Sequence, residues 1–266
     1  MTLLGHALIE VPGIGSPALA PWIIVTLALT AFLTSAFSAV VGMGGGVVLL
    51  VTMLLFLDPL DAIPLHGAIQ LISNSTRATV QRRHLAWNLV FRYSILLLPF
   101  GALSIMLVND LPREHLTGCI GIFVILATWR PRWLLMGLRA DRIDAERRFL
   151  LLGGLVGFLN ILVGAVGPFI SPFFLNMDLS RQAIVGTKAA CQTCGHVVKI
   201  LLFGLAGFAF LSFLPLLLVM FPMVITGTWA GSRLLEQLGD RSFTRLFKGV
   251  LTCVATWLIV KTLVGS

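Results

Sequence analysis

Gly42-Met43-Gly44-Gly45-Gly46 lies inside an apolar stretch of membrane length, and this short segment decides the fold. Four glycines in five residues break a membrane helix, because glycine has no side chain and favours non-helical turns. An apolar segment follows at once, so the chain resumes as a short helix whose first N–H groups are unpaired. Adding 122 to each position leads to a second interruption, Gly164-Ala165-Val166-Gly167-Pro168, where Pro168 can begin another short helix. The sequence therefore predicts the same helix break twice.

Each helix break is followed by polar residues at the spacing i, i+4, i+8, i+11. They are His66, Gln70, Asn74 and Arg77 in the first half, and Lys188, Gln192, His196 and Lys199, each 122 positions later, in the second. On a helix this spacing falls within an arc of about 80°. Polar groups that face lipid are costly, so both series should face the interior of a helical bundle. The pattern predicts a duplicated membrane protein with one central site.

The composition is that of a membrane protein. Of the 266 residues, 58% are hydrophobic and 11% are charged, whereas about 25% are charged in soluble chains. A span needs about 20 mostly apolar residues, and the segments expected to be helical are 22–41, the short 46–57, 62–80, 86–108, 116–130, 149–166, the short 168–177, 182–203, 206–232 and 243–263. We predict an all-α, polytopic integral membrane protein in which two repeats, 1–130 and 149–266, form one functional unit. Loop 131–148 joins them.

The net charge of +8 comes from basic residues that gather in a few regions. They include Arg77, Arg82 and Arg83, six arginines within 130–148, Arg181, and Arg233, Arg241, Arg245 and Lys248. Cytoplasmic loops are enriched in Lys and Arg, so these regions should face the cytoplasm and orient the protein in the cell membrane. Segment 62–80 then runs inward and 182–203 outward, which makes the repeats inverted and places both termini on the outer side. The basic charge does not indicate a nucleic-acid partner.

All eleven acidic residues lie in loops, at termini or at helix ends. The membrane interior therefore offers cations and amides but no carboxylate to bind Na⁺ or relay protons, and this predicts a small anion as the substrate. Helix N-termini also bind anions through their free N–H groups. If a proton gradient drives transport, His66, His196 or the substrate must carry the proton. The residues predicted to bind substrate are Gly44, Gly45, Gly46, His66, Gln70, Asn74, Gly167, Pro168, Lys188, Gln192 and His196.

Several of these residues also have simpler explanations. The glycines could serve only to let helices pack closely, and the amides could be hydrogen-bond glue between helices. Arg77 and Lys199 lie near helix ends, where they could extend to the interface or act as gating and secondary anion contacts.

Cys191-Gln192-Thr193-Cys194 places two thiols on one side of a helix. Without a second ligand pair at a suitable spacing the segment does not predict a metal site, so Cys191 and Cys194 are interpreted as small buried residues or as soft contacts for a sulfur-containing substrate. An intramembrane enzyme, either a thiol oxidoreductase that uses this pair or a protease, is one rival function. No buried Asp or Glu is available for acid–base chemistry, and the one weak Ser–His combination is Ser73 or Ser75 with His196, so we expect neither an enzyme nor a cofactor. A passive anion channel with the same positive lining is the other rival.

At the first glycine block, at its counterpart Gly164 to Pro172 and in the duplicated layout, the chain resembles the sulfite exporter TauE/SafE family. This family is also named the 4-toluene sulfonate uptake permeases, and the resemblance covers nearly the whole chain. The chain departs from the pattern at Val51 and Thr52, where a proline is expected, and at Val166 and Pro168, where the fuller pattern has glycines. The resemblance implies a carrier for sulfite, sulfonates, thiosulfate or sulfoacetate that is driven by the proton gradient. Such a carrier would move one repeat against the other around the site.

Overall fold

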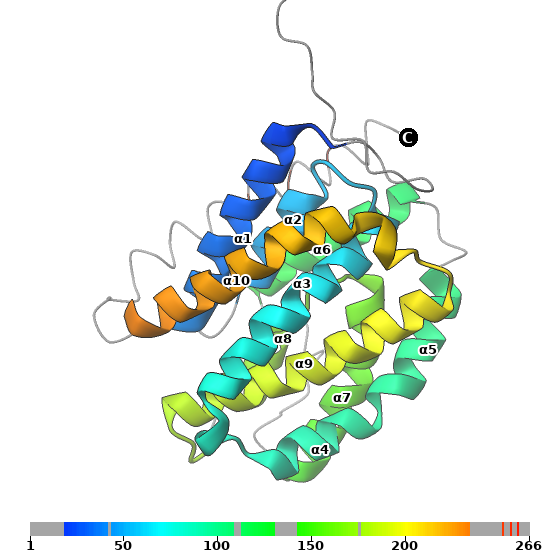
Figure 1. Cartoon of the computed structure of the whole chain (residues 1–266). Coiled ribbons are helices and arrows are strands. Elements are labelled where there is room, and N and C mark those ends of the chain that lie inside the picture. Colours follow the sequence, from blue (N-terminus) through cyan, green and yellow to red (C-terminus); the bar gives the residue numbers. More distant parts are fainter. Residues whose placement is uncertain are drawn as a thin grey trace, which may run out of the picture.

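A computed structural model of the chain describes residues 19–41, 44–108, 113–130, 143–174 and 177–234, together with residues 252, 256 and 260. Every regular element in these ranges is a helix, and none is a strand (Figure 1). Three helical stretches are long and apolar enough to cross a membrane, namely Pro21–Val40, Trp87–Val108 and Phe210–Arg233. The protein is therefore an all-α integral membrane protein.

The first half follows the expected order of segments. Its elements are α1 (Pro21–Val41), α2 (Gly45–Met53), α3 (Pro59–Val80), the 3-10 turn η1 (Arg82–His84), α4 (Trp87–Ile95), α5 (Leu97–Val108) and α6 (Arg113–Trp129). Gly44, with φ 91°, forms the turn before α2, and a residue with a side chain rarely adopts this conformation. The glycine break predicted from the sequence is confirmed at Gly44, whereas Gly42 and Met43 lie outside the described residues.

The second half differs from the expected boundaries in three places. Its elements are α7 (Ala145–Leu162), α8 (Gly167–Ile170), the 3-10 turn η4 (Ser171–Phe174), α9 (Arg181–Leu205), η5 (Phe210–Phe213) and α10 (Leu214–Leu234). α7 begins before position 149, because the Asp144 carboxylate caps it by accepting from the N–H groups of Glu146 and Arg147. The second short helix ends before 177. A turn at Gly207, with φ 94°, delays the next helix from 206 to 210.

Some predictions fall on residues that the structure does not describe. These are the two chain termini, most of loop 131–148 and the last segment, 243–263, of which only residues 252, 256 and 260 are described, as helical.

The element boundaries of the two halves repeat at an offset of 122 residues, the same offset that relates the two polar series. α2 and α8 begin at Gly45 and Gly167, and α3 and α9 begin at Pro59 and Arg181, so each pair is 122 residues apart. The duplication seen in the sequence is therefore a duplication of structural elements.

α3 and α9 lie side by side and run antiparallel (Figure 1). A Cβ atom on Gly67, near the start of α3, would meet Lys199 near the end of α9. A Cβ atom on Gly186, near the start of α9, would meet Gln81, which follows α3. Matching helices that run in opposite directions are what inverted repeats require.

The fourth helical segment of the second repeat packs against the first helix of the other repeat. Gly227 and Gly231 of α10 lie against the backbone carbonyls of Phe32 and Ala36 of α1. The residue numbers increase together along the two helices, from Gly227 and Phe32 to Gly231 and Ala36, so α1 and α10 are parallel. The missing side chains allow this close approach of the two backbones.

The first helix of the second repeat, α7, packs in the same way against the fourth segment of the first repeat. Gly153 and Gly157 of α7 lie against the backbone carbonyls of Tyr93 and Leu97, so α7 runs parallel to α4 and α5. Two groups of helices result. The first bundle consists of α1, α2, α3 and α10, and the second bundle consists of α4, α5, α7 and α9, with α8 attached through η4. α3 and α9 form the main contact between the bundles.

Basic side chains of several elements gather at one end of the molecule. Arg82 and Arg83 follow α3, and Arg181 at the start of α9 donates to the carbonyl of Val40 at the end of α1 (3.0 Å). This common basic end agrees with the charge pattern from which the orientation was predicted. That it faces the cytoplasm stays a prediction.

Candidate functional site

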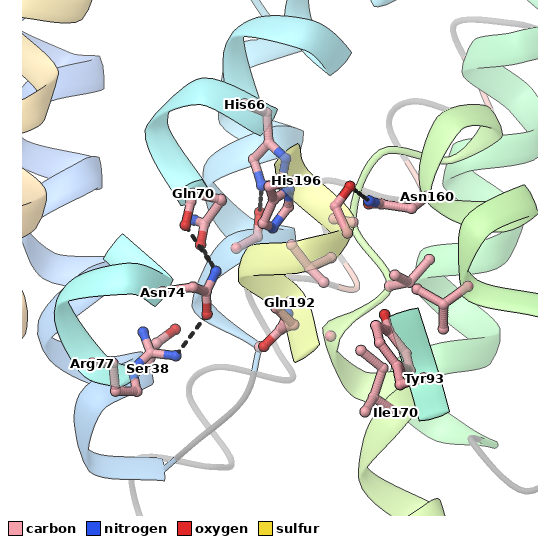
Figure 2. A pocket seen from close by; sticks show the side chains of 18 residues that line it. Ser38, His66, Gln70, Asn74, Arg77, Tyr93, Asn160, Ile170, Gln192 and His196 are labelled. Atoms are coloured by element: carbon pink, nitrogen blue, oxygen red, sulfur yellow. Dashed lines mark hydrogen bonds between the residues drawn. The ribbon is translucent and has the colours of Figure 1, made fainter. Parts of the chain in front are cut away.

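A cavity lies between the two bundles, close to the contact of α3 with α9 (Figure 2). The space between the atoms that line it is about 460 Å³, including the part that is open to solvent. Its polar lining consists of Ser38, His66, Gln70, Asn74 and Arg77 from the first bundle, and Tyr93, Asn160, Gln192 and His196 from the second. The structure therefore brings most of the two polar series to one place.

The two repeats line the cavity with equivalent residues. The pairs that are 122 positions apart are Ser38 and Asn160, Gly44 and Val166, Gln70 and Gln192, and Asn74 and His196. Each repeat gives one member of each pair, so the cavity lies where the two repeats meet.

The polar series on α3 faces the cavity along its whole length. His66, Gln70, Asn74 and Arg77 are each at most 5% exposed, and all four line the cavity. The alternative that Arg77 extends to the membrane interface is wrong, because its side chain lies inside the bundle. The series also shows that a spacing of i, i+4, i+8, i+11 on an apolar segment predicts a common interior face.

Three side chains of this series form a directed chain of hydrogen bonds (Figure 2). Arg77 donates from Nη1 to Oδ1 of Asn74 (3.1 Å), and Asn74 donates from Nδ2 to Oε1 of Gln70 (3.3 Å). Because the guanidinium can only donate, it fixes the orientation of both amides. The Nε2 group of Gln70 is left as a donor at the end of the chain.

The two glutamines lie over the starts of the two short helices. A Cβ atom on Gly46 would stand 3.2 Å from Cδ of Gln70, and one on Gly167 would stand 3.2 Å from Nε2 of Gln192. These two glycines keep the space in which the glutamine amides lie. The helices themselves differ, since α2 has nine residues and α8 has four, so the second one contributes little of a helix dipole.

His66 and His196 meet across the contact of the two repeats. Their ring centroids are 5.9 Å apart in an edge-to-face arrangement with an interplanar angle of 76°. Nε2 of His66 donates to the backbone carbonyl of Gly46 (2.8 Å), because a carbonyl can only accept. Both rings line the cavity, so two groups able to exchange protons lie beside the same space.

Lys188 and Lys199 are buried, but neither lines the cavity. Lys188 donates to the hydroxyl of Ser171, and Lys199 donates to the backbone carbonyl of Gly164 (2.6 Å). Gly164 and Ser171 stand on either side of α8, so the two lysines hold both ends of the segment that carries it. Lys199 does not extend to the interface. Lys188 contacts the α8 segment and does not itself line the cavity.

Four other predicted residues also lie away from the cavity lining. They are Gly45, Pro168, Cys191 and Cys194. A Cβ atom on Gly45 would overlap the backbone of Thr34, so close packing is the role of this glycine. Cys191 is buried and Cys194 half-buried, and both are free thiols. Within the described ranges no group of three His, Cys, Asp or Glu residues could hold a metal ion.

Among the polar residues and glycines that line the cavity, sequence reasoning missed four. They are Ser38, Tyr93, Asn160 and Gly195. Ser38 and Asn160 could have been found, because they are also 122 positions apart, but they precede the helix breaks, where no polar series marks them. Tyr93 is the single tyrosine of the chain, and its repeat counterpart, Pro215, is not a polar residue, so no repeat signal identifies it.

The comparison with known families agrees with this architecture. A family model described as sulfite exporter TauE/SafE matches residues 27–258. The chain belongs to this family. The match to the TauE/SafE model includes both helix breaks, both polar series and every polar residue of the cavity lining. No curated protein and no solved structure matches the chain. As a TauE/SafE family member the protein is a membrane transporter, in a family of transporters and not of enzymes.

Proposed function

We propose that the protein is a secondary transporter that carries a small sulfur-containing oxyanion through the cavity between the two bundles. The substrate is of the sulfite, sulfonate, thiosulfate or sulfoacetate class. The observation that carries the proposal is the chemistry of the lining. It holds a guanidinium, two imidazoles and six amides or hydroxyls, and no carboxylate among the described residues; the six are Ser38, Gln70, Asn74, Tyr93, Asn160 and Gln192. Such a set stabilises a negative charge and repels no anion.

In this proposal the residues have separate roles. The fixed amide of Gln70 and the amide of Gln192 donate to the oxygens of the anion, while Arg77 neutralises its charge. His196 is the second cationic candidate, because it lines the cavity from the opposite repeat. Lys188 and Lys199 act on the anion only through the longer-range field of their charges, since their ammonium groups are bonded to the α8 segment.

Alternating access would move the first bundle against the second. The moving parts are not residues 1–130 and 149–266, because α10 belongs to the first bundle and α4 and α5 to the second. Inverted repeats support such a movement, since each half can adopt in turn the conformation of the other. In the membrane, the basic end of the protein would face the cytoplasm and both termini would lie outside. A proton gradient would drive the transport. Either the His66 and His196 pair or the substrate carries the proton.

The test is flux of labelled sulfite into proteoliposomes that contain the purified protein. Gln70→Leu and Gln192→Leu each remove a donor to the anion, so the apparent affinity should fall about tenfold, as for loss of a hydrogen bond to a charged group. Cys194→Ser is the matched control on α9, because this thiol does not line the cavity. Unchanged flux in both glutamine variants would reject the site.

The same vesicles distinguish a carrier from the two rival functions. A carrier gives saturable flux that responds to a pH gradient. An anion channel would give single-channel currents, and a thiol oxidoreductase would lose its activity in the Cys194→Ser control.

A further inference from the structure

Asn160 offers a hydrogen-bond acceptor in a cavity that otherwise offers mainly donors. This residue lies on α7 with 3% of its surface exposed. Its Nδ2 group donates to the backbone carbonyl of Gly195 (3.2 Å), and this bond fixes the amide, because a carbonyl cannot donate to Oδ1. Oδ1 has no hydrogen-bond partner in the part of the chain that the structure describes. A buried acceptor without a donor is unfavourable, so a partner from the cavity is needed.

Tyr93 offers a second unsatisfied group at the same corner of the cavity (Figure 2). Its hydroxyl is fully buried and has no partner among the described residues. Gly195 lies next to both residues. A Cβ atom there would stand 3.4 Å from Nδ2 of Asn160 and 3.6 Å from the Tyr93 hydroxyl, so the glycine keeps this corner open. The corner therefore combines a hydroxyl that can donate with an amide oxygen that can only accept.

A fully deprotonated oxyanion cannot satisfy both groups. Its oxygens accept from Tyr93, but it has no hydrogen to give to Asn160. We propose that the transported substrate is an anion that carries its own hydrogen-bond donor, which it gives to Oδ1 of Asn160. The donor is the proton of a singly protonated oxyanion or the hydroxyl of a short organic sulfonate. This inference rests on the proposed function and adds the chemical class of the substrate.

The repeat relation gives the substrate one orientation in the cavity. The counterpart of Asn160 is Ser38, whose hydroxyl can donate as well as accept. The counterpart of Tyr93 is Pro215, which has no polar side chain. The pair of Tyr93 hydroxyl and Asn160 amide oxygen thus lies in the second bundle, while Arg77 and Gln70 stand in the first. The charged oxygens of the substrate face the first bundle and its donor faces the second.

The test compares two sulfonates of equal charge and similar size. 2-Hydroxyethanesulfonate has a hydroxyl where propane-1-sulfonate has a methyl group. Their affinities follow from the rise in unfolding temperature of the purified full chain with ligand concentration. We expect the wild-type protein to bind the hydroxyl compound at least tenfold more tightly, because a site built around a hydrogen bond rejects an analogue that lacks it.

Variants locate the preference within the cavity. Asn160→Leu should remove it, and Ser38→Ala, the matched change in the other repeat, should preserve it. Tyr93→Phe should weaken both ligands alike and leave their ratio unchanged. If Asn160→Leu does not fold, the comparison of the two sulfonates in the wild-type protein still tests the proposal.

A third ligand separates the two sources of the donor. Sulfite should bind more tightly as falling pH raises its protonated fraction. The titratable groups that line the cavity with Asn160 from neighbouring helices include Tyr93 on α4 and His196 on α9, and Cys191 and Cys194 of α9 interact with Tyr93. Propane-1-sulfonate does not change its protonation over the pH range in which sulfite does. Any change in its affinity with pH therefore reports the contribution of these protein groups.

The outcomes are distinct. Tighter binding of sulfite at low pH, beyond the change for propane-1-sulfonate, supports the proton as the donor, and a preference for the hydroxyl compound supports the hydroxyl. Equal binding of the two sulfonates, with no such change for sulfite, would show that water satisfies Asn160 and would overturn the inference alone. Binding of none of the three ligands would overturn the proposed function itself.

Discussion

At the scale of single residues, the buried cations of the two polar series occupy different places. Arg77 lines the cavity and orders the amides of Asn74 and Gln70, whereas Lys188 and Lys199 are bonded to the segment around α8. Equivalent positions in the repeats thus carry different chemistry. Of the arginine and lysines in the two series, Arg77 is the one that lines the cavity.

Arg77 is therefore the residue whose replacement should change affinity most. Arg77→Lys keeps the charge but not the fork of donors that orders Asn74, so the apparent affinity for sulfite should fall about threefold to tenfold at a similar maximal flux. Arg77→Gln also removes the charge and should lower the affinity by at least a further factor of ten, as expected for a charged hydrogen bond worth about 1.5–3 kcal/mol. Flux against sulfite concentration measures both effects.

Arg82 provides the control for charge alone. It is exposed on η1, beyond the end of α3, so Arg82→Gln removes an equal charge without touching the cavity. Wild-type affinity in Arg77→Gln would contradict the role of the guanidinium.

The sequence predicted which face of α3 lines the cavity, but not what each cation contacts. Periodicity places a residue on a face, and all four members of the α3 series do line the cavity. It does not say where the end of a long side chain lies. Lys188 shares its repeat position with His66, yet its ammonium group extends to Ser171, a contact that depends on how α8 folds back.

At the scale of elements, glycines set the distances between helices. α7 can approach α4 and α5 because Gly153 and Gly157 have no side chains, and their spacing of four residues places them on one face. The spacing is visible in the sequence. The partner helix is not, since any apolar helix could accept such a face.

Gly157→Ala should destabilise the protein, because its Cβ atom would stand 2.6 Å from the carbonyl oxygen of Leu97. Overpacking of this kind costs about 1–3 kcal/mol. Gly204→Ala is the matched control on α9, where a Cβ atom would meet only Phe210 at 3.9 Å. This control should be neutral or should stabilise by up to about 1 kcal/mol through helix propensity. Unfolding temperatures in detergent measure both, and equal stability of the two variants would contradict the tight contact.

At the scale of the whole molecule, the sequence repeats and the packed bundles are different units. The duplication was predicted from an offset of 122 residues, and the element boundaries repeat with it. The exchange of fourth segments was not predicted, because contacts between α1 and α10 join residues about 195 positions apart. The cavity consequently lies between bundles that each contain helices from both repeats.

This arrangement predicts which cross-links stop transport. The end of α3 and the start of α9 belong to different bundles, and a Cβ atom on Gly186 would stand 2.7 Å from Cβ of Gln81. A disulfide has a Cβ–Cβ distance of about 3.8 Å, so a small shift would allow the bond in Gln81→Cys/Gly186→Cys. Oxidation should abolish sulfite flux, and reduction should restore it. The native cysteines Cys119, Cys191, Cys194 and Cys253 would first be replaced.

A second pair, within one bundle, separates loss of movement from the presence of a disulfide. Ser35 of α1 and Ser73 of α3 both belong to the first bundle, and their hydroxyl oxygens are 3.2 Å apart. Ser35→Cys/Ser73→Cys should therefore cross-link on oxidation and still transport, because these helices move together. Flux that persists with Gln81→Cys/Gly186→Cys fully oxidised would show that the contact of α3 with α9 stays closed throughout the cycle. The two bundles would then be one rigid body, and access to the cavity would have to come from the short segments α2 and α8.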